Sequence, residues 1–87
     1  MCANIVERAS LSGSGKGLSG WFPLTEAAVS YDHPFHVDLE HAVNIDFTNE
    51  ASGLEARVAV ELSLESARAL SRALLVALER AENYENQ

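Results

Sequence analysis

Alternation of apolar and polar residues is clearest in two neighbouring segments near the middle of the chain. Residues 41–48, "HAVNIDFT", place every second side chain on one side: His41, Val43, Ile45 and Phe47. Residues 54–62, "LEARVAVEL", do the same with Leu54, Ala56, Val58, Val60 and Leu62. A period of two is typical of half-buried β-strands, so we predict two strands joined by a turn over 49–53, "NEASG".

The first half of the chain has a weaker pattern. Residues 2–11 are expected to form a strand of mixed pattern, and residues 12–20, rich in glycine and serine, a loop. Residues 21–31 are expected to form a second strand, in which Pro23 favours an edge or a strand start because it donates no ladder hydrogen bond. A loop of roughly seven to nine residues follows before the strand over 41–48.

Residues 64–83 repeat apolar side chains at helical spacing and predict a helix. Ser63 is the expected N-cap, and Glu65 in the first turn suits the helix dipole. The stripe consists of Ala67, Leu70, Leu74, Ala77, Leu78 and Ala81.

Together these elements predict an α+β fold of class ββββα over one domain, residues 1–87, with the C-terminal helix packed on one face of a four-stranded antiparallel sheet. One helix covers only part of such a sheet, and a chain this small buries a marginal core. A homo-oligomer, with a dimer favoured, is the expected remedy.

Composition narrows the class of protein. The 87 residues include 13 acidic and 6 basic residues, for a net charge of -7. This acidic balance argues against nucleic acid and against anionic membranes as partners, and no apolar run is long enough to span a bilayer. Because Cys2 is the only cysteine and the first residues lack signal-peptide features, a cytoplasmic location is expected.

The stretch "GSGKG" at 13–17 invites comparison with a phosphate-binding loop. That loop requires the pattern G-x-x-x-x-G-K-[ST]. Here Ser10 stands where the first glycine is needed, and Gly17 follows Lys16 in place of the magnesium-binding hydroxyl. We therefore expect a flexible hairpin loop or mobile flap, with at most a weak anion contact at Lys16.

All three histidines lie in "YDHPFHVDLEH", residues 31–41. His33 and His41 stand at the two ends of the predicted loop and come together if the flanking strands pair, with His36 between them. Three imidazoles around one ion are typical of a zinc site, and added carboxylates suit iron or manganese. The further candidates are Cys2 as a ligand; Asp32, Asp38 and Glu40 as ligands or ring-orienting partners; and Tyr31, Phe35 and Trp21 as pocket walls.

Other roles compete for the same residues. His41 is in phase with Val43, which also fits a histidine at the edge of the core, while histidines beside Pro34 often lie in solvent or cap a turn. Histidine also suits acid–base or pH-sensing work, because its pKa is near ~6.5. For Cys2 the favoured interpretation is a small, half-buried apolar residue near a strand start.

The polar sides of the two patterned segments would form one mixed-charge face. Its members are Asn44, Asp46, Glu55, Arg57 and Glu61. We interpret it as a solvated sheet face carrying an Asp46–Arg57 ion pair; a polar cavity or a dimer seam is the alternative. Trp21 and Phe22 point to opposite sides of their strand, so one is expected inside and the other is an exposed anchor for a partner.

The strings "LSGSGKGLSGWFPLTEAAVSYDHPFH", "EHAVNIDF" and "ARVAVELSLESARAL" together resemble a family of small actinobacterial proteins of unknown function. The resemblance covers nearly the whole chain. It implies a standalone bacterial domain and brings no activity or catalytic residue.

Three functions therefore stand side by side. The first is a divalent-metal or small-ligand site at His33, His36 and His41, where a bound metal would polarise a substrate or acidify water. The second is a non-catalytic, homo-oligomerising interaction module, and the third is a pH-responsive ligand carrier. Whether the chain is an enzyme is left open by the sequence.

Overall fold

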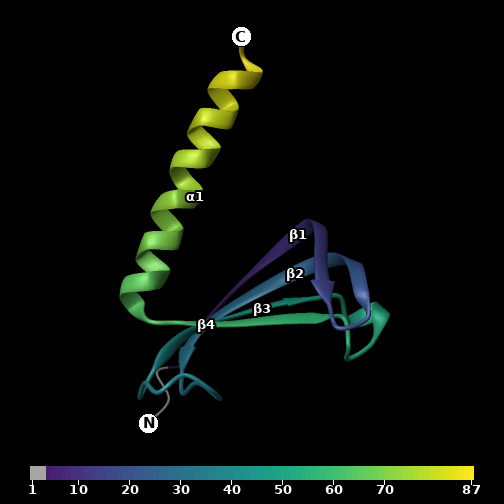
Figure 1. Cartoon of the computed structure of the whole chain (residues 1–87), viewed down its shortest axis with the longest axis vertical. Coiled ribbons are helices and arrows are strands. Elements are labelled where there is room, and N and C mark those ends of the chain that lie inside the picture. The colour runs from purple at the N-terminus through teal and green to yellow at the C-terminus, as the bar shows by residue number, and fades with distance from the viewer. Residues whose placement is uncertain (1–3) are drawn as a thin grey trace.

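The computed structural model describes residues 4–87. Four strands form one antiparallel sheet in chain order: β1 (Ile5–Gly17), β2 (Gly20–Asp32), β3 (Ala42–Thr48) and β4 (Arg57–Leu62). A short 3-10 turn, Glu50–Ser52, connects β3 to β4, and the helix α1 (Leu64–Glu85) follows (Figure 1). The predicted ββββα class is confirmed.

The glycine-rich segment is a strand, and the predicted loop over 12–20 is wrong. β1 continues to Gly17, and the turn to β2 is only two residues long. Gly15 and Gly17 are two positions apart in β1 and therefore face the same side of the strand. A Cβ on Gly15 would lie 3.1 Å from the Leu24 side chain, and one on Gly17 would lie 3.1 Å from the Phe22 ring. The glycines therefore make room for two large side chains of β2, which is why a strand tolerates them.

Pro23 lies where the sequence expected it, on an unpaired edge. β2 pairs with β3 only from Glu26 onward, so the stretch before Glu26 pairs with β1 alone. The carbonyl of Pro23 accepts a 3.0 Å hydrogen bond from the side-chain amide of Asn49, which is buried. This contact ties the turn after β3 to the β1–β2 hairpin.

β4 is shorter than predicted, because it begins at Arg57. The segment before it is a tight turn in which Gly53 has a φ of 95°, a conformation that favours glycine. Leu54, predicted on the buried face, is 99% exposed, which corrects that expectation. Residues 54–56 alternate in sequence like the strand that follows them, but in the structure they belong to the turn before β4.

Register separates the central sheet into two faces. The apolar face carries Val29, Val43, Ile45, Phe47, Val58, Val60 and Leu62. The polar face carries Ser30, Asn44, Asp46, Arg57 and Glu61. Within β3 and β4 both sets follow the predicted alternation, but Glu55, also expected on the polar face, lies in the turn before β4.

α1 begins as predicted, with the Ser63 hydroxyl accepting a 3.1 Å hydrogen bond from the Ser66 N–H. The helix stands on one side of the sheet and the loop 33–41 lies on the other (Figure 1). Because that loop bonds to Glu61 on the polar face, the helix stands on the side of the apolar face. Ala67 is the one half-buried helical residue, so its side of the helix faces the sheet.

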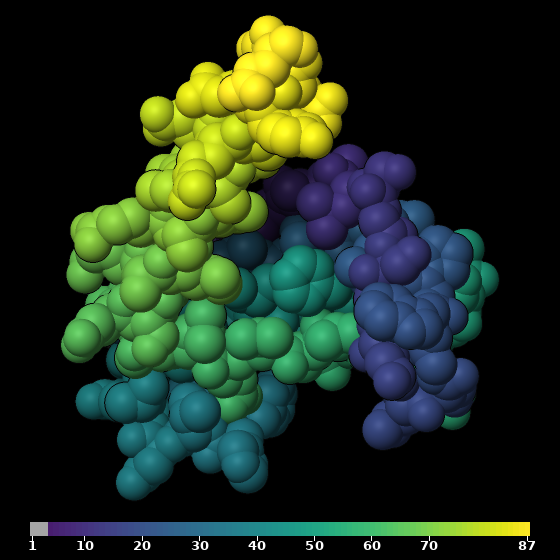
Figure 2. Space-filling model, turned by 45° about the horizontal axis from the view of Figure 1, so that its top comes forward, coloured from purple at the N-terminus to yellow at the C-terminus, as the bar shows by residue number. Residues whose placement is uncertain are grey.

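The sheet and helix enclose very little core. Among the described residues, the buried apolar ones are Ala27, Ala42 and Ala56, and no large side chain is fully buried. The C-terminal part of α1 projects beyond the sheet, and Leu74 and Leu75 are 59% and 65% exposed (Figures 1 and 2). No helix in the described range is long and apolar enough to cross a membrane.

Candidate functional site

The loop 33–41 is fixed to the polar face by a single carboxylate. Glu61 on β4 accepts hydrogen bonds from three consecutive backbone N–H groups: Phe35 (2.6 Å), His36 (3.0 Å) and Val37 (2.9 Å). These bonds favour the charged carboxylate and hold its pKa below the ordinary value of 4.5, with the Val37 and Phe35 amides as the main causes. Glu61 therefore sets the path of the loop.

Two of the three histidines do meet. The rings of His33 and His41 stack with centroids 4.8 Å apart, and His41 also stacks on Tyr31 at 5.5 Å. The Nδ1 of His33 lies 2.9 Å from the carbonyl oxygen of Glu40. Because a carbonyl only accepts, Nδ1 carries the proton in this contact, and Nε2 is left as the acceptor of a neutral ring. The predicted proximity of the loop ends is confirmed.

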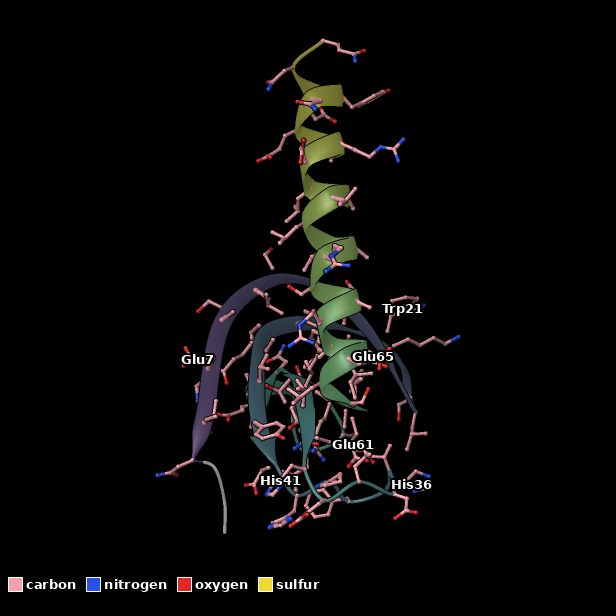
Figure 3. All side chains as sticks on the ribbon, turned by 90° about the vertical axis from the view of Figure 1, so that its left-hand side faces the viewer. Glu7, Trp21, His36, His41, Glu61 and Glu65 are labelled. Carbon is pink, nitrogen blue, oxygen red and sulfur yellow. The ribbon has the colours of Figure 1, made fainter. Side chains whose placement is uncertain are left out.

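His36 does not join that pair. Its backbone is held by Glu61, and its side chain projects away from His41 (Figure 3). Within residues 4–87, no three histidine, cysteine, aspartate or glutamate side chains gather as a metal-binding group. The expectation that the three rings converge on one point is therefore not met, and Cys2 lies outside the described residues.

The acidic residues of the loop are placed apart from a common centre. Asp38 and Glu40 are exposed, and Glu40 contributes its backbone carbonyl rather than its carboxylate to the His33 contact. Asp32 accepts a 2.7 Å hydrogen bond from the N–H of His33, the residue that follows it directly at the end of β2. This bond is local and does not bring Asp32 together with Asp38 or Glu40.

The polar face and the loop enclose a recess of about 390 Å³, which we call the polar recess. It is lined by Ser30, Asp32, His33, Phe35, Asn44, Asp46, Arg57, Ala59 and Glu61. The predicted ion pair lies within it, with Arg57 Nε 2.8 Å from Asp46 Oδ1. Phe35 borders the recess as a pocket wall, although its side chain is 98% exposed.

Trp21 is not a wall of this recess. It lies at the far end of β2, paired with Lys16 across the β1–β2 hairpin, and is 72% exposed. Phe22 is half-buried, so one aromatic is inside and the other outside, as predicted. Lys16 and Trp21 therefore lie together on an exposed hairpin, away from the histidines.

A family model matches residues 1–87 and is described as a family of unknown function (DUF6295). The chain belongs to DUF6295. No curated protein and no solved structure matches it. Membership agrees with the resemblance to a small family of unknown function and brings no activity to this DUF6295 chain.

Sequence reasoning missed the role of Glu61 in this DUF6295 member. The residue belongs to the expected polar face, but nothing in its neighbourhood in the chain points to a loop 24 to 26 residues earlier. The available signal was indirect. A glutamate near the end of β4 lies opposite Asn44 in the pairing of β3 with β4, close to the start of β3 where the loop ends.

Proposed function

We propose that the chain functions as a non-catalytic, homo-oligomerising module whose working unit is a dimer. The supporting observation is exposed surface. The chain exposes 7046 Å², whereas a compact monomer of 9.4 kDa exposes about 5,000 Å². The radius of gyration of 14.8 Å likewise exceeds the roughly 12 Å expected for 87 residues.

The excess has the size of an obligate interface. If each chain buried its surplus of about 2,000 Å², a dimer would bury about 4,000 Å² in total, within the range of obligate homodimers. The exposed surface includes large apolar side chains, because Leu70, Leu74 and Leu78 are at least half exposed along one side of α1. Burial of such surface is the main driving force of association.

Helix variants test the proposal. Leu70→Gln/Leu74→Gln removes apolar surface while keeping a good helix former at both positions. We expect light scattering after gel filtration to show loss of the dimer, with or without unfolding of the chain. The matched control is Arg72→Gln/Glu79→Gln, which changes the other side of α1, leaves the net charge unchanged, and should stay dimeric. A double-leucine variant that dimerises like the native chain would contradict the proposal.

A small polar ligand in the polar recess is a second candidate function. Its support is the clustering of Asn44 and the Asp46–Arg57 pair beneath the loop that carries His33. Volumes of about 300–1,000 Å³ are usual for small-molecule sites. Titration with small amines, carboxylates and amino acids should move the amide signals of 30–33 and 44–46, and Asn44→Ala should abolish the effect. No shift with any of them would argue against this function.

A further inference from the structure

The space-filling view shows an open hollow on the apolar side of the sheet, which we call the apolar hollow. It lies between α1 on one side and β1 on the other, with β3 and β4 at its floor (Figure 2). At the centre of that floor, Ile45 of β3 pairs with Val29 of β2 on one side and with Val60 of β4 on the other. The side of α1 that carries Ala67 forms its wall, and Leu74 and Leu78 continue that side beyond the first turns.

We propose that the occupant of the apolar hollow is the α1 helix of a second copy, so that two chains exchange helices across their sheets. This inference rests on the proposed dimer and specifies how it is built. Each chain then supplies one helix and receives one, which closes the assembly at two copies under two-fold symmetry.

The composition of α1 supports a helix with neighbours on more than one side. Residues 73–78, "ALLVAL", are apolar without interruption and therefore cover the full circumference of the helix. Leu75 is 65% exposed and Val76 is 49% exposed, and they point away from the Leu74 side. A helix that is apolar all round is normally buried on all sides. The chain's own sheet contacts only one side of α1. In the proposed dimer, the partner's helix and the partner's sheet would cover the remaining apolar sides of residues 73–78.

The alternative of two sheets packed directly face to face does not fit the hollow. Stacked sheets lie about 10 Å apart. Because α1 rises from the end of β4 on the apolar side, it occupies the space that a second sheet would need (Figure 1). In the proposed dimer, a single helix, about 10 Å in diameter, takes the place of that second sheet and lies beside α1.

Mixed disulfide formation tests the exchange. In a Cys2→Ser background, one chain carries Ile45→Cys and an isotope-labelled partner carries Leu74→Cys, so a mixed disulfide necessarily joins two chains. After co-refolding and oxidation, we expect mass spectrometry to find the mixed species as the main product. Leu78→Cys, one turn later, is a second reporter in case Leu74→Cys weakens the dimer. Glu79→Cys, on the other side of α1, is the control and should give little product.

The outcomes separate the two proposals. A dimer that forms the mixed disulfide with either reporter supports helix exchange. A dimer that forms it with neither reporter overturns helix exchange and leaves the proposed homo-oligomeric function standing. Native chains that are monomeric overturn both.

Discussion

The Glu61 carboxylate accepts a 2.6 Å hydrogen bond from the backbone N–H of Phe35, a residue 26 positions earlier in the chain. The same carboxylate bonds the next two amides, so one side chain on β4 determines how the histidine loop leaves β2. His33 and His41 are neighbours because their strands pair, but the position of His36 follows from Glu61.

Replacing Glu61 should free the loop while leaving the sheet intact. In Glu61→Ala we expect the amides of Phe35, His36 and Val37 to exchange with solvent markedly faster, whereas amides of β2 and β3 keep their protection. Hydrogen exchange followed by NMR measures this. Glu55→Gln, which alters an exposed glutamate in the turn before β4, is the control. Unchanged protection at all three loop amides would show that the carboxylate does not hold the loop.

The same contact predicts a pH dependence. The pKa of Glu61 is lower in the folded chain than its ordinary value of 4.5, so its contribution to stability is complete above pH 4.5. That contribution is lost as the pH falls below 4.5 through the depressed folded pKa. The amide signals of Phe35 and Val37 should therefore show a transition below pH 4.5 that Glu61→Gln lacks. A transition below pH 4.5 that persists in Glu61→Gln would contradict this contribution of Glu61.

Gly15 and Gly13 in β1 provide a matched pair that tests whether the glycines make room for side chains of β2. Gly15→Val should destabilise the fold by about 1–3 kcal/mol, because its Cβ lies within 3.1–3.3 Å of Leu24 before any further methyl is added. Gly13→Val should be neutral or stabilising, since no atom lies within 4 Å of its Cβ and valine favours strands. Denaturant unfolding compares them. Equal effects at both positions would refute the account of the glycines.

Metal binding by the three histidines remains a competing prediction with a direct measurement. Because His36 is turned away from the His33–His41 pair, we expect protein purified without a histidine tag to hold far less than one metal ion per chain. The triple His→Ala variant should show the same content by elemental analysis. A near-stoichiometric zinc, iron or manganese content that the triple variant loses would establish the metal site.

Much of the fold follows from local pattern. Alternation predicted the apolar and polar faces of β3 and β4, and Ser63 marked the start of α1 because its hydroxyl caps the first turn. The glycine strand was missed for a physical reason. Glycine has no side chain to signal a strand, and its presence is explained only by Leu24 and Phe22 on the neighbouring strand.

The candidate site was predictable only in part. Strand pairing was sufficient to bring His33 and His41 together. The position of His36 depends on Glu61, a partner distant in the chain whose role no local pattern encodes. Leu54 was predicted on the buried face because it fits the alternating pattern of 54–62. It is exposed because it lies in the turn at Gly53, before β4 begins.

Sedimentation equilibrium of the native chain tests the central claim most directly. We predict a single species of twice the 9.4 kDa chain mass that persists on dilution to low micromolar concentration. A folded species of 9.4 kDa across that range would contradict the account, because the exposed apolar side of α1 would then be stable in water without a partner.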